Sequence, residues 1–444
     1  MRATDGRRNP GLAFAIRWAL LLLPAVMAAT PASARDAKVV PFKVFVASLK
    51  SARAESFVGR TDARLQDAGA FAQMRAHLLG MYDGVSAARS FALDGQVFDC
   101  IPLMQQPSVR QLGLSGIATP PPTAPGDTAS EDALPAAEKT VDAFGNPQQC
   151  AAGTIPMRRI TLQELSRYRT LAEFFRKYPP GAMQDDSNGI DTSAHRWAHA
   201  YDFPFNWGGE AVHSVFRPAV MTRLSEVFSL SQQWYSGKFS GSPSQTAEVG
   251  WQVYPAKWGN LNPTVFIYWT RDDYKNSGCY NLDCAGFVQV SSRHPLGAAL
   301  RPPGVVGGAQ REEYFAYRLY QGGWWVAVGP TKAESVWVGY YPTKIYGRGQ
   351  MYYYATEFDI GGETVGSGRW PGMGSGQWAT RGFRYAAYDR NIQYRDSNNL
   401  LYAPRLTPVV NGANTHNCYA ITTPSYTSSW LTNFYFGGPG GTKC

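Results

Sequence analysis

The sequence lacks the motifs that mark the commonest hydrolases and metalloenzymes. It contains no G-x-S-x-G, no H-E-x-x-H, no C-x-x-C and no phosphate-binding P-loop, and no set of histidines and cysteines has the spacing of metal ligands. Activated serines, zinc sites and bound nucleotides depend on such patterns. The sequence therefore predicts neither a metal nor a cofactor, and it leaves carboxylates as the side chains most able to carry chemistry.

Charge of either sign is also scarce. Only 17% of the 444 residues are charged, and the formal net charge is +9. No run of lysine and arginine alternates with aromatic residues along one strand, as it does in RNA-recognition folds. We therefore expect no nucleic acid partner, and we interpret the charges as solvated surface.

Long hydrophobic runs are absent except near the N-terminus. There, basic residues precede the short apolar stretch 18–29, and Ala32-Ser33-Ala34 offers a small-residue cleavage site. A membrane-spanning helix needs about 20 apolar residues, which is more than this stretch supplies. The pattern predicts a signal peptide over residues 1–34, cleaved near Ala34, and hence a secreted or periplasmic protein without a stable membrane anchor.

Cysteine is sparse but even in number. All six cysteines follow the predicted signal peptide, and an exported chain with an even number of cysteines is expected to form disulfides. The spacing favours three bonds, although six cysteines allow other connectivities. The favoured pairs are Cys279 with Cys284, Cys418 with Cys444, and Cys100 with Cys150.

What is abundant is glycine, with 45 residues, and aromatic side chains, which make up 14% of the chain. This composition suits antiparallel strands and turns better than a helical bundle. The apolar spacing predicts helices over residues 64–81 and 161–178, the second capped by Thr161 with Glu164 at the reciprocal position. Between them, residues 113–154 are rich in proline and small residues and are predicted to form a disordered loop. A polar connector at 184–189 is of the kind that proteases cut readily.

Short alternating runs follow from His195 to the C-terminus, separated by glycine and proline turns. Many evenly spaced strands indicate a β-sandwich or a barrel. The expected strands cover residues 212–217, 227–235, 247–254, 265–270, 286–291, 314–319, 324–328, 337–341 and 383–388.

Two glutamates have contexts that suggest a role. Period-two alternation places Glu248, Gly250 and Gln252 on one face of a strand, opposite an apolar face, with the glycine leaving room for a substrate backbone. Glu363 follows Gly361-Gly362, a pair that is costly in a strand unless a bulge or a close approach requires it. From the pattern alone, a solvent-facing glutamate is the favoured interpretation of Glu248, and a glutamate beside a turn is at least as good an interpretation of Glu363. His195, His199 and His213 are interpreted as neutral histidines of the surface or of a domain boundary.

Several motifs, in one order along the chain, resemble those of the neprosin catalytic domain over roughly residues 195–444. An upstream segment, Asp94-Gly95-Gln96-Val97-Phe98-Asp99-Cys100-Ile101 followed by Gln105-Gln106-Pro107, resembles the neprosin activation peptide. The catalytic-domain motifs are Phe228-Ser229-Leu230-Ser231-Gln232-Gln233-Trp234, Glu248-Val249-Gly250-Trp251-Gln252-Val253, Gly278-Cys279-Tyr280-Asn281-Leu282-Asp283-Cys284-Ala285-Gly286-Phe287-Val288-Gln289, Gly322-Gly323-Trp324-Trp325, Val338-Gly339-Tyr340-Tyr341-Pro342 and Met373-Gly374-Ser375-Gly376.

The resemblance implies a mainly β protein. Its catalytic domain would be an antiparallel β-sandwich over residues 190–444, preceded by a small α+β pro-domain within a pro-region over 35–189. The paired catalytic glutamates of the family match Glu248 and Glu363 here. The implied protein is a glutamic endopeptidase that is made as a zymogen and cleaves peptide or protein substrates after proline at acidic pH. Acidification would protonate the carboxylates that hold the pro-region.

The same resemblance suggests residues that bind the substrate, which is expected to be a peptide or a proline-rich protein. Gln252 is a candidate polar helper. Tyr268, Trp325 and Tyr340 are candidates for an aromatic lining of an open cleft, with ordinary sandwich packing as the alternative for each.

A carbohydrate-active sandwich is the main alternative, because two carboxylates and aromatic rings also suit a glycosidase. A lectin-like binding protein is a third reading, but it would have no need for a pro-region.

Overall fold

The computed structural model describes residues 39–122, 141–143, 146–177 and 194–444. These residues all belong to the unit Lys38–Cys444. The predicted signal peptide, its cleavage site near Ala34 and the connector at 184–189 lie outside the described residues. Within the described ranges, no helix is long and apolar enough to cross a membrane.

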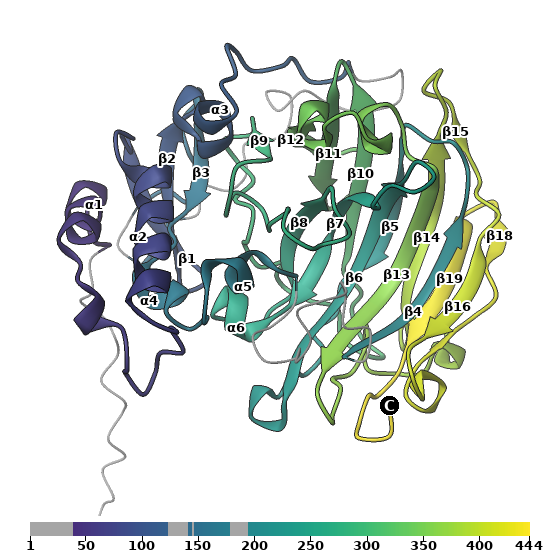
Figure 1. Cartoon of the computed structure of the whole chain (residues 1–444). Coiled ribbons are helices and arrows are strands. Elements are labelled where there is room, and N and C mark those ends of the chain that lie inside the picture. The colour runs from purple at the N-terminus through teal and green to yellow at the C-terminus, as the bar shows by residue number, and fades with distance from the viewer. Residues whose placement is uncertain (1–38, 123–140, 144–145, 178–193) are drawn as a thin grey trace, which may run out of the picture. The chain divides into compact units, whose positions relative to one another are not determined.

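Residues 39–177, here called the N-terminal region, combine helices with a small antiparallel sheet in the order β1-β2-β3. This is the α+β organisation that was expected for the part of the chain before the sandwich. Its elements are α1 (Phe42–Ser51), η1 (Ala54–Ser56), α2 (Ala68–Tyr82), β1 (Arg89–Leu93), β2 (Gln96–Pro102), η2 (Leu103–Gln105), α3 (Pro107–Gln111), β3 (Thr154–Arg158), α4 (Leu162–Leu165) and α5 (Leu171–Phe175) (Figure 1).

The two predicted helices have different outcomes. The first is observed as α2, which begins later than expected because the side chain of Asp67 accepts a hydrogen bond from the backbone of Ala70 at 2.8 Å. The second, predicted over 161–178, is divided into α4 and α5. Thr161 caps α4 as expected, but Thr170 accepts from the backbone of Glu173 and so starts a second helix. Two capping residues close together favour two short helices over one long helix.

Parts of the loop predicted to be disordered over 113–154 are ordered in the structure. Residues 113–122 run in an extended conformation against the sandwich, and the backbone of Ala118 donates to the hydroxyl of Tyr340 at 3.1 Å. Val141 and Pro147 form an antiparallel bridge. Disorder was expected because the segment cannot bury enough apolar surface by itself. It is ordered because it packs against residues that lie elsewhere in the chain.

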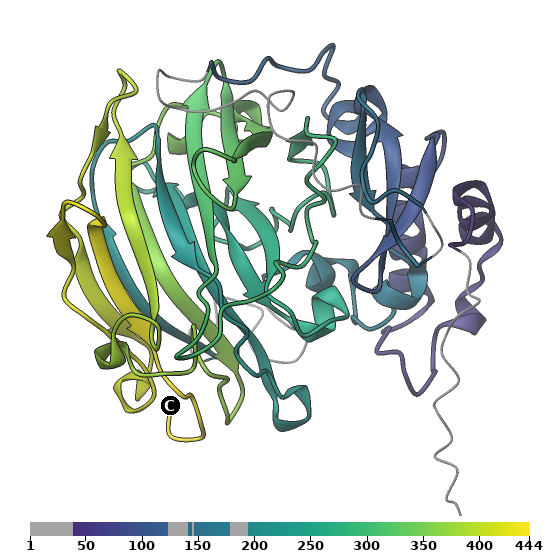
Figure 2. The ribbon, with the colours of Figure 1, turned by 180° about the vertical axis from the view of Figure 1, so that it is seen from behind.

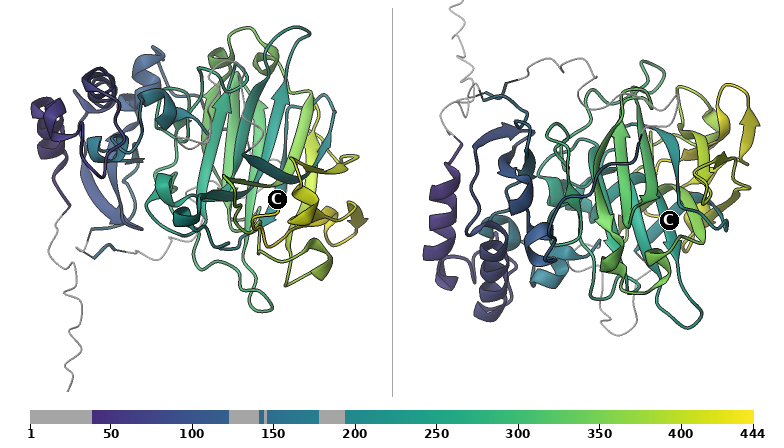
Figure 3. Two further views of the ribbon diagram at one scale, coloured as in Figure 1. Left: turned by 60° about the horizontal axis from the view of Figure 1, so that its bottom comes forward. Right: turned by 90° about the horizontal axis from the view of Figure 1, so that it is seen from above.

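Residues 194–444 form two antiparallel sheets. The six-stranded sheet has the order β16-β4-β13-β6-β7-β8, with β4 (His195–Asp202), β6 (Glu226–Gly237), β7 (Gln245–Val253), β8 (Thr264–Thr270), β13 (Glu357–Gly366) and β16 (Thr407–Asn411). The ten-stranded sheet has the order β17-β19-β14-β5-β10-β11-β12-β9, with β15 on β14 and β18 on β19. Figure 2 shows the two sheets from behind, and Figure 3 shows them from below and from above.

The strands of the ten-stranded sheet are β5 (Gly208–Ser214), β9 (Val288–Gln289), β10 (Glu312–Tyr320), β11 (Gly323–Gly329), β12 (Val336–Pro342), β14 (Ala387–Arg395), β15 (Leu401–Tyr402), β17 (Ala420–Ile421), β18 (Ser425–Thr427) and β19 (Leu431–Gly437). Short helices connect the strands: η3 (Thr222–Leu224), α6 (Pro255–Trp258), η4 (Thr343–Tyr346), η5 (Gln350–Tyr352), η6 (Ala379–Arg381) and η7 (Thr415–Asn417). The strand expected at 383–388 begins only at Ala387, because a turn follows η6, in which the backbone of Ala386 donates to Gly382.

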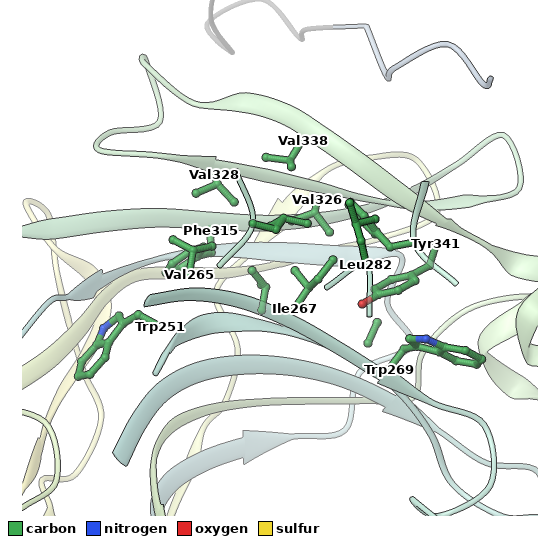
Figure 4. Close-up of a cluster of buried hydrophobic side chains, with 14 of the residues drawn as sticks. Trp251, Val265, Ile267, Trp269, Leu282, Phe315, Val326, Val328, Val338 and Tyr341 are labelled. Carbon is green, nitrogen blue, oxygen red and sulfur yellow. The ribbon is translucent and has the colours of Figure 1, made fainter. Parts of the chain in front are cut away.

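The hydrophobic core lies between the two sheets, so the antiparallel sandwich that was expected is confirmed. Trp251, Val265 and Ile267 from the six-stranded sheet face Phe315 and neighbouring residues of the ten-stranded sheet (Figure 4). Fully burying one such side chain stabilises the fold by roughly 1.5–3 kcal/mol. Because alternate residues of β7 enter this core, Glu248 points to the outer face of the six-stranded sheet.

All three expected disulfides are present. Cys100 bonds to Cys150 in the N-terminal region, Cys279 bonds to Cys284 in the loop before β9, and Cys418 bonds to Cys444 at the C-terminus.

Candidate active site

The structure brings Glu248 and Glu363 together on the outer face of the six-stranded sheet. Glu248 lies on β7 and Glu363 on β13, with β6 between them. Both are buried, and neither is the solvent-facing glutamate of the alternative interpretation. One ammonium group, that of Lys177, lies 2.6 Å from Oε2 of Glu248 and 3.1 Å from Oε2 of Glu363. The two carboxylates are therefore close enough for one small group to bridge them.

Lys177 comes from the N-terminal region and reaches the pair just after α5. Its third acceptor is Oε1 of Gln232, at 3.1 Å. An ammonium group has three N–H donors, so each has an acceptor in the site. The sequence analysis missed this lysine because an isolated lysine beyond a helix has no distinctive pattern. The available signal was indirect, since two buried carboxylates require a nearby cation.

The charges around Glu363 alter its protonation. Burial by itself would raise the pKa of this carboxyl, but the ammonium of Lys177 and the imidazole of His195 outweigh that effect and lower the pKa to about 2. His195 contributes a direct contact of 2.5 Å from Nδ1 to Oε1 of Glu363. Burial would lower the pKa of Lys177, but the two glutamates raise it. At neutral pH the site therefore holds an ionised Glu363 beside a charged Lys177.

Glu248 has a different set of neighbours. The hydroxyl of Tyr274 donates to its Oε1 at 2.7 Å, and the hydroxyl of Thr246 donates to the same oxygen at 3.1 Å. Apart from Lys177, these hydrogen-bond partners are neutral, whereas Glu363 also contacts an imidazole. The two carboxyl groups are therefore not equivalent.

A cavity of about 530 Å³ adjoins the pair. Trp197 and Trp234 line it, beside His195, Gln232 and Glu363. The ring of Trp197 stacks on that of His195, with centroids 5.1 Å apart. This cavity offers apolar ring faces next to the carboxylates, which suits a peptide side chain or a proline ring.

Of the two positions expected for the three histidines, the surface and a domain boundary, the surface was wrong. His195, His199 and His213 are all buried, and each contacts a carboxylate. His199 lies 2.6 Å from Asp359 in the wall of the cavity. Burial raises the pKa of Asp359 to about 6 against the opposing effect of His199. The partners of these histidines could not be predicted from local patterns because they lie more than a hundred residues away along the chain.

Two of the proposed binding residues lie at the site. Tyr268 donates to the backbone carbonyl of Phe175 at 3.2 Å, and its ring stacks on Tyr274. Gln252 donates to the hydroxyl of Tyr280 at 3.2 Å, and Tyr280 in turn donates to the carbonyl of Lys177 at 3.5 Å. Tyr280 was not singled out from the sequence, although it belongs to one of the quoted motifs.

Trp325 and Tyr340 are not at the site. They lie on β11 and β12 of the other sheet, buried in a cluster with Val109 and Val288. Their alternation correctly indicated strands, but alternation does not reveal which of two sheets a strand joins.

Glycines near the glutamates are required by strand packing. A Cβ on Gly361, whose φ is +145°, would lie 2.6 Å from the carbonyl oxygen of Ala198 on β4. A Cβ on Gly250 would lie 2.1 Å from the carbonyl oxygen of Ser231 on β6, so strand β6 occupies the space that was expected for a substrate. These close approaches hold the strands that carry both glutamates.

The chemistry available is that of two carboxyl groups and their hydrogen-bond partners. Within the part of the chain that the structure describes, no group of three or more histidines, cysteines, aspartates and glutamates is placed to hold a metal ion.

In a comparison with known protein families, residues 225–439 match the family model described as Neprosin. Two solved structures of scytalido-glutamic peptidase, with a transition state analog inhibitor and with a peptide based transition state analog, are 9% and 10% identical to the chain. They cover 54% and 55% of it and 97% and 98% of their own chains, with TM-scores of 0.30 and 0.31. A structure of SCP-B, a member of the Eqolisin family of peptidases in a complex with a tripeptide, is 10% identical over 55% of this chain and 97% of its own, with a TM-score of 0.30. TM-scores this low carry no argument about the chain.

Proposed function

We propose that the chain, whose residues 225–439 match the Neprosin family model, is a secreted glutamic endopeptidase made as a zymogen. In this proposal, Glu248 and Glu363 activate a water molecule that hydrolyses a peptide bond. Cleavage after proline at acidic pH belongs to the same proposal, on the strength of the family resemblance.

One observation carries the proposal: a single nitrogen bridges the two carboxylates. Nζ of Lys177 accepts no proton and attacks nothing while it is charged, but it marks a position within hydrogen-bonding distance of both glutamates. A water molecule at that position after Lys177 has left would contact a proton acceptor on each side. Two such carboxyl groups share one proton at acidic pH, because like charges this close do not both ionise cheaply.

The unequal surroundings of the two glutamates support a different role for each. Glu363 is the base, because the imidazole of His195 remains on its Oε1 and favours the carboxylate. Glu248 holds the shared proton on Oε2, the oxygen that Lys177 vacates, while Tyr274 and Thr246 stay on Oε1. These two hydroxyls orient the acid without removing its proton.

The reaction then proceeds in two balanced steps. The water oxygen bonds to the scissile carbonyl carbon as Glu363 takes one of its protons, and Glu248 gives its proton to the carbonyl oxygen. When the C–N bond breaks, the proton on Glu363 passes to the leaving amine, and the second hydroxyl returns its proton to Glu248. Both glutamates end in their starting states.

The zymogen part of the proposal is supported by the position of Lys177 and its neighbours, which occupy places that a water molecule and a substrate would need. The ammonium fills the position of the water, and the carbonyls of Phe175 and Lys177 take the hydroxyls of Tyr268 and Tyr280. A substrate backbone would use the same two hydroxyls once the segment leaves. Inhibition is therefore electrostatic and steric at once.

Nothing in the site favours the carbohydrate alternative. Two of the aromatic residues that it relied on, Trp325 and Tyr340, are buried on the other sheet.

The test is hydrolysis of a proline-containing peptide from acidic to neutral pH by the acid-activated chain and by Glu248→Gln and Glu363→Gln variants. Each variant is expected to lose at least about 10³-fold in kcat, because it removes either the base or the acid. Glu313→Gln is the matched control, since Glu313 is a buried carboxyl on β10 of the other sheet. Activity that survives in either site variant, or that is abolished by a metal chelator, contradicts the proposal.

A further inference from the structure

A row of large side chains crosses the outer face of the ten-stranded sheet, on the opposite side of the sandwich from the glutamates. Arg318 on β10 is directly paired with Trp325 on β11, which is paired with Tyr340 on β12. The rings of Trp325 and Tyr340 lie 4.6 Å apart. Gly323 makes room for them, because a Cβ there would lie 2.8 Å from the ring of Tyr340. We call Arg318, Trp325 and Tyr340 the aromatic row.

Residues 112–122 of the N-terminal region cover this row without helix or strand, with a turn at 112–113 and a bend at 115–116. The segment leaves α3 and passes from β12 towards β10 (Figures 1 and 3). The hydroxyl of Tyr340 accepts from the backbone of Ala118 at 3.1 Å, and Arg318 donates to the carbonyl of Pro122 at 3.1 Å. Lys344, beyond the end of β12, donates to the carbonyl of Leu112 at 2.6 Å.

These contacts recognise a chemical class more than a particular sequence. All three hydrogen bonds join a side chain of the sandwich to the backbone of the segment, and the segment contributes apolar side chains such as Leu114 and Ile117 to the cluster. At the Arg318 end the segment reads Pro120-Pro121-Pro122, in which the middle proline is buried and its neighbours are exposed. Proline-rich chains adopt an extended helix with little entropy to lose, and grooves lined by aromatic rings bind them for this reason.

Release of the N-terminal region would uncover a continuous apolar surface. Trp325 and Tyr340 are 0% and 5% exposed while the segment is in place, and the half-buried rings of Tyr320 and Trp337 belong to the same cluster. Monomeric proteins rarely expose contiguous apolar patches unless the patch binds something. An occupant with the chemistry of the departed segment would restore each of its contacts.

We propose that the aromatic row is a second binding surface, separate from the active-site cavity, for extended proline-containing segments of polypeptide substrates. The proposal rests on the proposed maturation, because the surface becomes available when the segment leaves. A long substrate held there would have a raised effective concentration at the glutamates. Short peptides that reach only the cavity would gain nothing from it.

The experiment uses the full chain with Glu248→Gln, so that bound peptides are not cut. In one version, residues 114–122 are replaced by a glycine–serine sequence of equal length, which uncovers the row. A fluorescent peptide with the sequence of residues 112–122 is titrated against this uncovered chain and against the intact chain. Two further peptides are compared: one with alanine at the three prolines, and an unrelated one with three consecutive prolines.

We expect both proline peptides to bind the uncovered chain at least about tenfold more tightly than they bind the intact chain, and the alanine peptide to bind about tenfold more weakly. In the uncovered chain, Trp325→Leu should remove the binding. Arg318→Gln, at a side chain that is only half-buried, should weaken it several-fold while leaving thermal unfolding unchanged. Lys332→Gln, in the turn between β11 and β12, is the matched control for loss of a cation.

Three results overturn the proposal: no binding to the uncovered chain, equal binding of the proline and alanine peptides, or binding that neither Trp325→Leu nor Arg318→Gln reduces. Binding of the chain's own segment without the unrelated proline peptide also overturns it, because the row would then be only a docking surface for the N-terminal region. None of these readouts requires peptidase activity, so a failure of the proposed function is separately visible in the Glu248 and Glu363 variants.

Discussion

The N-terminal region covers the outer faces of both sheets, and the two contacts are chemically opposite. On the six-stranded sheet, the charged side chain of Lys177 enters a buried site between Glu248 and Glu363. On the ten-stranded sheet, an extended segment lays its backbone and apolar side chains on Trp325 and Tyr340. The first contact depends on ionised groups, whereas the second contains no titrating acid.

The difference implies that acidification acts on one contact and spares the other. An ion pair in a buried site disappears when its carboxylate is protonated. Apolar burial and hydrogen bonds that contain no carboxylate do not change over the same range of pH. The N-terminal region would then be released from the active-site pair first. It would stay attached through the aromatic row until it is cleaved from the chain and dissociates.

Replacing Lys177 should produce the largest difference between the two contacts. In a Lys177→Met chain, two buried carboxylates lose their cation, and the contact around α5 should weaken by about 3–5 kcal/mol. Hydrogen exchange of residues 171–177 at neutral pH should accelerate accordingly, while exchange of residues 114–122 stays as it was. Lys332→Met, which removes a lysine paired with Glu210 at 2.8 Å, is the control. Equal exchange in the Lys177→Met and wild-type chains would show that the ion pairs do not hold the segment.

Lowering the pH should produce the second largest effect. The pKa of Glu363 falls from its usual 4.5 to about 2 in the folded chain. A carboxyl with a lowered pKa contributes stability above its usual value, and that contribution is lost as the pH falls from about 4.5 towards 2. The shift corresponds to about 3 kcal/mol.

Hydrogen exchange of residues 171–177, corrected for the intrinsic rate at each pH, should therefore increase across this window. Residues 114–122 serve as the internal control. Simultaneous loss of protection in both segments would mean that the two contacts are not independent.

Replacing His195 tests the assignment of the base. His195→Gln should lower kcat about 10–100-fold with a small change in KM, because the imidazole positions Glu363 and keeps it ionised. The acidic limb of the kcat/KM profile should move to higher pH, since the contact with His195 lowers the pKa of Glu363 and its loss raises that pKa. His416→Gln, at an exposed histidine, is the control. A fall in activity with an unmoved acidic limb would assign His195 a structural role instead.

The smallest effect should come from a single hydroxyl on the aromatic row. Tyr340→Phe leaves the ring but removes the oxygen that accepts from Ala118, which should weaken the segment's contact by about 1 kcal/mol. Exchange of residues 114–122 should rise slightly and by the same factor at about pH 4.5 and at about pH 2, the two ends of the window above. If the effect of Tyr340→Phe on exchange were larger at low pH, the contact at the aromatic row would depend on pH as the contact at Lys177 does.

Much of the fold could be predicted from local patterns. The alternation around Trp251 correctly assigned the core face of β7, and the even number of cysteines correctly indicated three disulfides. The helix predicted over 161–178 was less successful, because local periodicity did not take account of a second cap at Thr170. Loop order over 113–122 could not be predicted either, since it depends on rings some two hundred residues away.

For the candidate site, the family motifs pointed to Glu248 and Glu363, and the structure places both at one lysine. Patterning alone left each glutamate undecided, because alternation distinguishes two faces of a strand but not which face meets solvent. His195 was misinterpreted as a surface residue for the same reason, and Lys177 was not noticed.

The sequence by itself determined the β class of the fold, most of the strands and the cysteines available for pairing, because these depend on residue types and on spacing along the chain. The two glutamates were indicated by the resemblance to family motifs. Only the tertiary structure decided which sheet each aromatic residue joins, that Lys177 lies between the glutamates, and that residues 112–122 cover the aromatic row. The physical reason is that buried charges and ring faces are satisfied by partners that are distant in sequence, and no local period encodes the identity of a distant partner.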